Sequence, residues 1–380
     1  MASQRTVGAL AAVAVGALMA ALLSLPVAEV RGVPIAFPAH TPQRSPAHTE
    51  QPSPCDLLVA ALPMRKRLAQ LIMIGVDPRG PAAALAAVRA EGVGAIFLGG
   101  ESTALLVDGR LSEVTGASAL PLTVAVDDEG GRVQRVESLD GPLPSARVMA
   151  DSMTEDQVRE TAKTRAERLL ARGVTLDFAP VVDISDQPDR AVIGDRSFSP
   201  DPDTATRYAA AFAEGLREGG MLPVLKHFPG HGRAEDSHKG PVSTPNLDEL
   251  RGTDLRPYAE LPRQGPVAVM IGHLDVPGLT NGAPASLDPA AYQLLRGELG
   301  FAGLTITDDL GAMRAVTERY DLPEAVLLSL RAGVDMPFWS SGTRLTEVLD
   351  RLEKAVQAGE LDSARVQESL ERVLSAKSAC

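Results

Sequence analysis

Titratable side chains are concentrated in the segment Lys226–Gly232, which reads Lys-His-Phe-Pro-Gly-His-Gly, and in Asp236-Ser237-His238 just after it. Three of the chain's six histidines lie in the twelve residues from His227 to His238. The apolar run Met221–Leu225 leads directly into the segment, so a buried strand is predicted to end here in a polar loop. A hydrophobic core has no use for so many titratable groups, and the pattern therefore predicts a catalytic or binding site.

The pair Asp236 and His238 has the composition of a general acid/base. A histidine titrates near neutral pH, and a nearby carboxylate fixes its tautomer and raises its pKa. Residues two positions apart on an irregular loop can meet in this way. We expect motion of the loop to carry His238 into and out of the site.

Two adjacent carboxylates, Asp308 and Asp309, follow the apolar run Leu304–Ile306. Glycoside hydrolysis with retention needs an anionic nucleophile and a second group that protonates the leaving oxygen and then activates water. Asp308 is predicted to be the nucleophile, and Gly311 allows the backbone to approach closely. Asp309 is expected to cap the turn that follows.

Two other interpretations of the cluster remain open. His227, His231, Asp236 and His238 are ligand types that zinc accepts, but their spacing matches no standard zinc signature. We therefore expect no metal and no other cofactor. A carbohydrate-binding barrel without catalytic activity would lack a nucleophile or an acid, whereas this chain has Asp308 and His238.

Short apolar runs alternate with amphipathic stretches along the chain, which indicates a parallel α/β sheet. Eight such units predict a (β/α)₈ barrel of the TIM type that forms a single catalytic domain, a fold that takes about 250 residues plus insertions. An open doubly wound sheet is the alternative, but no Gly-x-Gly-x-x-Gly follows a strand. The predicted strands are Leu71–Val76, Ala95–Leu98, Leu122–Val126, Thr175–Val182, Met221–Leu225, Val267–Ile271, Leu304–Ile306 and Val334–Trp339. The main predicted helices are Thr154–Arg172, Asp203–Glu218, Asp288–Glu298, Pro323–Ala332, Thr343–Gln357 and Leu361–Lys377.

Polar residues cluster where the predicted strands end. A barrel places all the carboxyl ends of its strands on one rim, so side chains far apart in the sequence are expected to converge on a single active site. The residues at these ends are Asp127 to Arg132, Asp183, Lys226 and His227, His273, Asp308 and Asp309, and Asp335.

The motifs resemble those of glycoside hydrolase family 3, and more specifically its NagZ-type β-N-acetylhexosaminidases. The resemblance covers nearly the whole chain from about residue 57. It rests on four segments: Lys226–Gly232 with Asp236-Ser237-His238, Thr307–Leu310 (TDDL), Val126–Arg135 (VDDEGGRVQR) and Ile193–Phe198 (IGDRSF).

The resemblance implies that Asp308 forms a covalent glycosyl-enzyme intermediate and that His238, held by Asp236, is the acid/base. For Arg132 and Asp128, salt bridging at the rim is at least as strongly expected as a role in binding. The residues implied to line the sugar subsite are Asp127, Arg135, Arg196, Lys226 and His227.

The resemblance also implies a substrate. It predicts a retaining exo-β-N-acetylglucosaminidase that acts on peptidoglycan-derived fragments or related oligosaccharides. Two-domain relatives, the β-glucosidases and xylosidases, usually take their acid from a glutamate in a second domain. This chain ends shortly after the eighth strand, so the Asp-Ser-His loop is expected to supply the acid. A histidine acid/base also leaves phosphate open as the acceptor, since it does not repel phosphate as a carboxylate would.

The N-terminus predicts export. Arg5 precedes an apolar run, Val7–Val27, which has the character of a signal peptide and is just long enough for a membrane anchor. Residues 1–28 are therefore assigned to an export signal or anchor, 29–54 to a disordered Pro/Ser-rich linker and 55–380 to the barrel. We expect an extracellular protein or one associated with the cell wall or membrane.

Cysteine content and charge add two expectations. The two cysteines, Cys55 and Cys380, bracket the barrel and would form one disulfide in an oxidising compartment. The net charge is −12, and the barrel has no basic run, so nucleic acid is not an expected partner. A small carbohydrate is the expected ligand of a monomeric protein.

Overall fold

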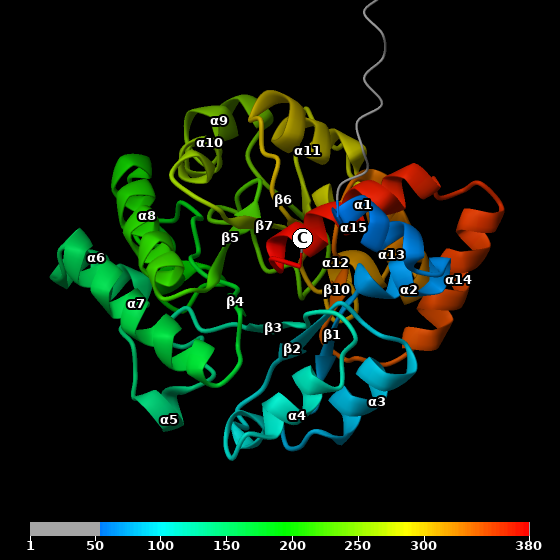
Figure 1. The fold of residues 1–380 in the computed structure, drawn as a ribbon. Coiled ribbons are helices and arrows are strands. Elements are labelled where there is room, and N and C mark those ends of the chain that lie inside the picture. Colours follow the sequence, from blue (N-terminus) through cyan, green and yellow to red (C-terminus); the bar gives the residue numbers. More distant parts are fainter. Residues whose placement is uncertain (1–53, 380) are drawn as a thin grey trace, which may run out of the picture. The chain divides into compact units, whose positions relative to one another are not determined.

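The computed structural model describes residues 54–379, with side chains from Leu57 onward, and its centre is a sheet of eight parallel strands (Figure 1). The strands are hydrogen-bonded in the order β10-β1-β2-β3-β4-β5-β7-β9. Their bounds are β1 Met73–Val76, β2 Ala95–Leu98, β3 Thr123–Val126, β4 Leu176–Asp177, β5 Leu222–Phe228, β7 Ala268–Ile271, β9 Thr305–Thr307 and β10 Phe338–Trp339.

The two outer strands of this order meet and close the sheet. A parallel bridge joins Ile306 of β9 to Met336, just before β10, and the Thr307 N–H donates to the Met336 carbonyl at 3.3 Å. Leu310 N–H donates to the Phe338 carbonyl at 3.0 Å. The predicted (β/α)₈ barrel is confirmed.

Helices surround the barrel (Figure 1). Their starts follow ordinary capping rules: Thr154 and Gln157 form a reciprocal capping box at α7, and Asp201 caps α8. The helices are α1 Pro54–Ala61, α2 Met64–Gln70, α3 Ala82–Ala90, α4 Arg110–Gly116, α5 Glu137–Asp140, α6 Ala146–Ser152, α7 Glu155–Ala171, α8 Pro202–Glu218, α9 Leu247–Gly252, α10 Arg256–Glu260, α11 Pro289–Gln293, α12 Arg314–Thr317, α13 Leu322–Ala332, α14 Leu345–Gln357 and α15 Ser363–Ala376. A short parallel pair, β6 Val242–Ser243 and β8 Leu274–Asp275, lies outside the barrel sheet.

The fourth strand is shorter than predicted. Only Leu176–Asp177 is a regular strand, because Pro180 has no N–H to donate to the ladder. The chain nevertheless stays against its neighbour, since the Val182 N–H donates to the Lys226 carbonyl at 2.9 Å. Asp183 is thereby carried to the same end of the barrel as Lys226.

The expectation that Asp335 lies on the catalytic rim is wrong. The regular strand β10 begins three residues later, at Phe338. Asp335 accepts from the backbone N–H of Thr305, the first residue of β9, at 2.9 Å. It therefore lies at the amino end of the strands, where it is fully buried and bonded to Arg296 at 2.6 Å and Arg365 at 3.1 Å.

Three phenylalanine rings pack together inside the barrel. Phe97 of β2, Phe178 after β4 and Phe338 of β10 have ring centroids 5.0 to 5.4 Å apart. Edge-to-face and offset stacking of this kind adds to the free energy gained by burying the rings. The cluster forms an apolar floor beneath the carboxyl ends of the strands.

The last helix lies beside the first ones. α15 packs against α1 and α2 (Figure 1). The side-chain nitrogen of Lys377 donates to Gln70 Oε1 at 3.1 Å. The structure does not test the predicted disulfide between Cys55 and Cys380, because the side chain of Cys55 and all of Cys380 lie outside its described part. The predicted export segment and linker lie outside that part as well. None of the helices that the structure describes combines the length and hydrophobicity that crossing a membrane requires.

A buried ion pair fastens the loop after β3 to α7. Asp128 is 0% exposed and accepts from Arg165 at 2.7 Å. The other oxygen of Asp128 accepts from the backbone N–H groups of Arg135 at 2.6 Å and Val136 at 3.3 Å. Asp128 is thus a buried structural residue and not a rim salt bridge.

We predict that Arg165→Leu lowers the free energy of unfolding by about 3–5 kcal/mol, because it leaves a buried carboxylate without its cation. Arg159→Leu on the same helix is the matched control. Arg159 forms an exposed pair with Glu218 at 3.1 Å, so its loss should cost less than about 1 kcal/mol. Urea denaturation measures both values, and equal losses would contradict the prediction.

Candidate active site

A cavity of about 290 Å³ opens at the carboxyl end of the strands. The phenylalanine floor closes its inner end, and charged side chains from several strand ends form its walls. The polar residues that line it are Asp127, Arg135, Arg196, Lys226, His227, His231, Ser237, His238, Asp308, Asp309 and Ser340. The barrel therefore brings together every residue that was predicted for catalysis or sugar binding except Asp236, which lies beside His238.

Lys226 is the buried cation of this cavity. Its ammonium lies 2.6 Å from Asp127 and 2.5 Å from Glu129, and the residue is 2% exposed. Burial alone would lower the pKa of Lys226, but the two carboxylates outweigh it and raise the pKa above its usual value. The lysine is therefore charged at neutral pH.

Glu129 also holds Arg196. The guanidinium donates two hydrogen bonds to the carboxylate, at 2.8 and 2.7 Å, in a bidentate pair. Burial raises the pKa of Glu129, but Arg196 and Lys226 outweigh it and bring the pKa well below the ordinary value. The sequence placed Glu129 at a strand end but assigned it no role, although a buried lysine and arginine in one site signal that a carboxylate must lie near them.

Asp183 organises the histidines after β5. One of its oxygens lies 2.7 Å from Nδ1 of His227, and the other accepts from the backbone N–H of His231 at 2.7 Å. Asp183 is buried, and its pKa is lowered because these histidines outweigh the effect of burial. Since Nδ1 of His227 is engaged, Nε2 is left to face the cavity. The sequence placed Asp183 at a strand end but assigned it no role.

Arg135 completes one wall. Its guanidinium lies 3.9 Å from Asp127, and its buried Nε has no partner among the described residues. Arg132, in contrast, is committed to structure: it pairs with Asp195 at 3.2 Å and donates to the carbonyls of residues 191–193. The salt bridging expected for Arg132 is present.

The two adjacent aspartates differ in their contacts. Asp309 Oδ1 accepts from the backbone N–H groups of Gly311 at 2.9 Å, Ala312 at 3.1 Å and Ser340 at 3.2 Å, so this carboxylate holds the turn together. Among the described residues, Asp308 Oδ1 accepts only the N–H of Asp309, at 2.8 Å. The Asp308 carboxylate is left free to act in the cavity.

The surroundings of Asp308 keep it ionised. Burial raises the pKa of this carboxyl, but His227, His273, the Asp309 N–H and Lys226 outweigh burial and bring the pKa below the ordinary value. An anionic carboxylate in a largely buried cavity is the state that nucleophilic attack requires.

Asp236 and His238 meet on the loop after β5. Asp236 Oδ1 lies 2.9 Å from Nδ1 of His238 and accepts the His238 backbone N–H at 3.0 Å. The residue between them fastens the loop, because the Ser237 carbonyl accepts from the Ala315 N–H at 3.1 Å and its hydroxyl lies 3.4 Å from His231 Nε2. The His238 side chain is 57% exposed, so it borders both the cavity and solvent.

Within residues 57–379, no group of three or more His, Cys, Asp or Glu side chains has a geometry that could hold a metal ion. The histidines of the loop are instead engaged singly, by Asp183, Ser237 and Asp236.

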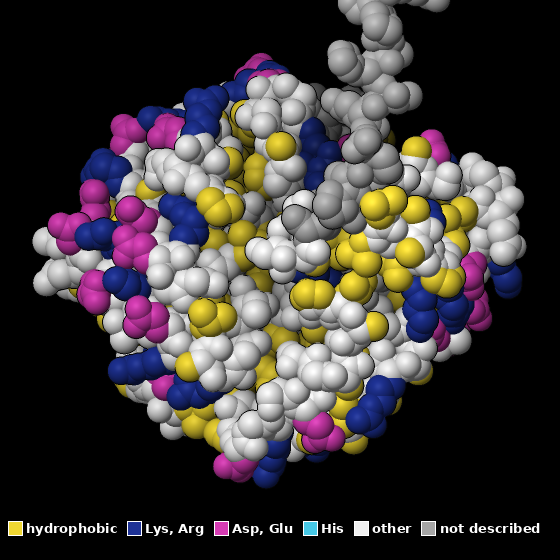
Figure 2. Space-filling model, viewed as in Figure 1, with side chains coloured by type: hydrophobic (Ala, Val, Ile, Leu, Met, Phe, Trp, Pro, Cys, Tyr) yellow, Lys and Arg dark blue, Asp and Glu magenta, His cyan; other side chains and the backbone are white. Residues whose placement is uncertain are grey.

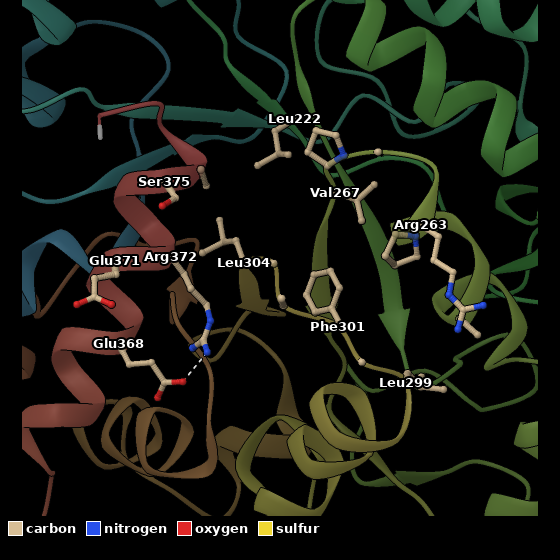
Figure 3. Close-up of a pocket in the computed structure, with 18 residues that line it drawn as sticks. Leu222, Arg263, Val267, Leu299, Phe301, Leu304, Glu368, Glu371, Arg372 and Ser375 are labelled. Atoms are coloured by element: carbon tan, nitrogen blue, oxygen red, sulfur yellow. Dashed lines mark hydrogen bonds and ion pairs between the residues drawn. The ribbon is translucent and has the colours of Figure 1, made fainter. Parts of the chain in front are cut away.

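A larger hollow, of about 600 Å³, lies at the opposite end of the barrel (Figure 3). Leu222, Val267 and Leu304, at or next to the amino ends of their strands, line it together with Phe301, and Arg372 of α15 pairs with Glu368 at its edge. None of the predicted site residues reaches it. In Figure 2, which is drawn from the side that carries α15, none of the described histidines is visible.

Comparison with known proteins gives a family. Residues 63–376 match the model described as the glycosyl hydrolase family 3 N-terminal domain. The "Beta-hexosaminidase LpqI" of Mycobacterium tuberculosis is 51% identical over 326 residues, which are 84% of each chain. A "Beta-hexosaminidase" of Stenotrophomonas maltophilia is 36% identical over 260 residues, which are 66% of this chain and 75% of that one.

Solved structures agree with the family. M. tuberculosis LpqI superimposes with a TM-score of 0.82 at 50% identity, covering 84% of this chain and 95% of that one. A family 3 β-N-acetylglucosaminidase from Paenibacillus sp. FPU-7 gives a TM-score of 0.80 at 29% identity, covering 84% and 63%. With a family model over most of the chain and a relative at this identity, the chain belongs to glycoside hydrolase family 3.

Proposed function

We propose that this family 3 hydrolase is an exported, exo-acting β-N-acetylglucosaminidase that removes terminal N-acetylglucosamine from cell-wall fragments or related oligosaccharides with retention of configuration. The observation that carries the proposal is that the candidate nucleophile and the candidate acid/base occupy different parts of the cavity. Asp308 is a free, ionised carboxylate on one wall, and the Asp236–His238 pair lies on a half-exposed loop at its mouth.

The chemistry follows from these positions. Asp308 attacks the anomeric carbon and forms a covalent glycosyl ester, while the protonated His238 gives its proton to the departing oxygen. His238, now neutral, takes a proton from water, and the hydroxide displaces Asp308 to release the sugar. Asp236 orients the imidazole and stabilises its charged form in both steps.

The shape of the cavity favours exo action. Its volume of about 290 Å³ ends on the rings of Phe97, Phe178 and Phe338, so only the end of a saccharide can enter. We propose that Asp127, Arg135, Arg196, Lys226 and His227 bind the hydroxyl groups of that terminal sugar. Buried charged groups of this kind reject analogues that lack the matching hydroxyl.

The source of the substrate is inferred from the N-terminus. The apolar run Val7–Val27 would carry the barrel out of the cytosol and leave it free or anchored to the membrane. Saccharides that end in N-acetylglucosamine are available there as wall fragments. The relatives named beta-hexosaminidase and β-N-acetylglucosaminidase support the same sugar.

A panel of nitrophenyl β-glycosides tests the proposal. We expect turnover of the N-acetylglucosaminide, little turnover of the glucoside and xyloside, and no acceleration by phosphate. Faster turnover in phosphate with release of a sugar phosphate would identify a phosphorylase, and no turnover at all would indicate a carbohydrate-binding protein. The same assay on cell fractions should find the activity in the envelope or medium, and activity confined to the cytosol would contradict export.

The two aspartates are predicted to fail in different ways. Asp308→Ala should lower kcat by a factor on the order of 10⁴ without unfolding the protein, because it removes the nucleophile. Asp309→Ala should instead lower the free energy of unfolding, by about 1–3 kcal/mol for each buried N–H left without a partner. Steady-state kinetics and urea denaturation of both variants separate the roles. A nearly native Asp308→Ala with an inactive, stable Asp309→Ala would reverse the assignment.

The acid/base is predicted to show leaving-group selectivity. His238→Ala should reduce turnover of chito-oligosaccharides by about 10²–10⁴-fold, because their alcohol leaving groups need a proton. The loss should be much smaller for nitrophenol, which leaves as an anion. Glu235→Ala, an exposed change on the same loop, is the matched control. Equal losses with both kinds of leaving group would assign His238 a structural role.

A further inference from the structure

His273 is a buried histidine beside the catalytic carboxylate, and the reaction steps proposed above assign it no role. It follows β7 by two residues and is 1% exposed. The neighbouring strand brings Asp308 next to it, since the Asp308 N–H donates to the carbonyl of Ile271 at 2.9 Å. His273 does not line the cavity, so it cannot reach a leaving group and is not a second acid/base.

One side of the His273 ring is held by Ser286. The hydroxyl of Ser286 lies 2.7 Å from Nδ1, and Ser286 is itself fully buried. The backbone of Ser286 is fixed as well: its N–H donates to the Gly272 carbonyl at 3.2 Å, and its carbonyl accepts from the Tyr292 hydroxyl at 2.9 Å. The imidazole therefore has a defined orientation.

This contact determines where the ring proton lies. Burial lowers the pKa of His273, so the ring is neutral at neutral pH and carries one proton. Among the described residues, the Ser286 hydroxyl has no acceptor other than Nδ1, and a buried hydroxyl needs to donate. Ser286 therefore donates to Nδ1, and the proton of His273 is on Nε2.

The other side of the ring faces the segment that carries the nucleophile. The Asp308 carboxylate, the Asp309 backbone and the Asp309 carboxylate all act to raise the pKa of His273, which opposes the effect of burial. Nε2 is buried, and no group among the described residues meets it with full hydrogen-bond geometry, although the Asp309 backbone lies close enough to act on the ring as an acceptor. A buried donor that lacks a well-formed hydrogen bond needs an explanation, and the adjacent carboxylate of Asp308 offers one.

We propose that His273 is a positioning residue for the hydrolysis proposed above: its neutral ring, oriented by Ser286, directs the Nε2–H at the Asp308–Asp309 segment and holds the nucleophile through both chemical steps. A neutral donor suits this task. A cation at this position would stabilise the free carboxylate more than the transition state in which its charge is lost, and would therefore slow the attack.

Asp308 is not controlled by His273 alone. Lys226 and His227 of β5 face it, His231 on the loop after β5 lies near it, and Asp309 follows it in the chain. The sugar-binding groups among these remain when His273 is replaced. The proposal therefore predicts a change in kcat and in the acid limb of the pH profile, with little change in KM.

The test compares His273→Leu with His273→Gln in the N-acetylglucosaminide assay. Leucine fills the space without a donor, and we expect kcat to fall by about 100-fold, the loss typical of a misplaced catalytic group. The acid limb of kcat/KM should move to higher pH, because the Nε2–H donor that favours the ionised form of Asp308 is gone. Glutamine places an N–H near the position of Nε2 and should recover most of kcat.

Ser286→Ala is the second test, and it leaves the imidazole in place. It removes the contact that fixes the tautomer and should lower kcat without moving the thermal midpoint as far as His273→Leu does. This variant carries the test if His273→Leu does not fold.

The outcomes separate the two proposals. A wild-type protein that does not cleave the N-acetylglucosaminide would contradict the proposed function. An active wild type with native kcat and an unmoved acid limb in His273→Leu would overturn the role of His273. Equal loss of kcat in the leucine and glutamine variants, with equal loss of stability, would also overturn it and leave only a packing role.

Discussion

The buried ammonium group of Lys226, at the carboxyl end of the barrel, determines where the neighbouring carboxylates and the loop that carries them must lie. Moving an unpaired cation out of water costs far more free energy than a protein of this size has to spare, so Lys226 needs carboxylates within contact distance. Asp127 and Glu129 supply them, and Glu129 in turn fixes Arg196. The loop after β3 must then lie against β5, and the buried Asp128–Arg165 pair holds it there.

The same principle divides the carboxylates into two groups. Those that accept several hydrogen bonds, such as Asp309 and Asp183, build the scaffold of the site. Asp308 keeps few contacts, and cationic or donor groups surround it. The positively charged surroundings keep it anionic although it is buried. Burying an ionised carboxylate that has few hydrogen-bond partners costs free energy. Groups of this kind occur mainly at functional sites, as Asp308 does here.

The sequence predicted the barrel and the membership of the site well, because both follow from local patterns. Apolar runs marked all eight strands, and the polar residues at their carboxyl ends converged as expected. The failure at Asp335 has a physical cause: a run such as Val334–Trp339 does not reveal which of its residues enter the ladder. Glu129 and Asp183 were missed as partners because ion pairing between residues 40 to 100 positions apart depends on the closed barrel, which composition does not encode.

The aromatic floor has a consequence for how the protein works along a saccharide. Phe97, Phe178 and Phe338 pack against one another and line the inner end of the cavity. In the exo action proposed above, the released monosaccharide would leave by the path through which the chain end arrived, so the shortened chain would have to withdraw first. Each cut would then require a fresh encounter, and degradation would be distributive.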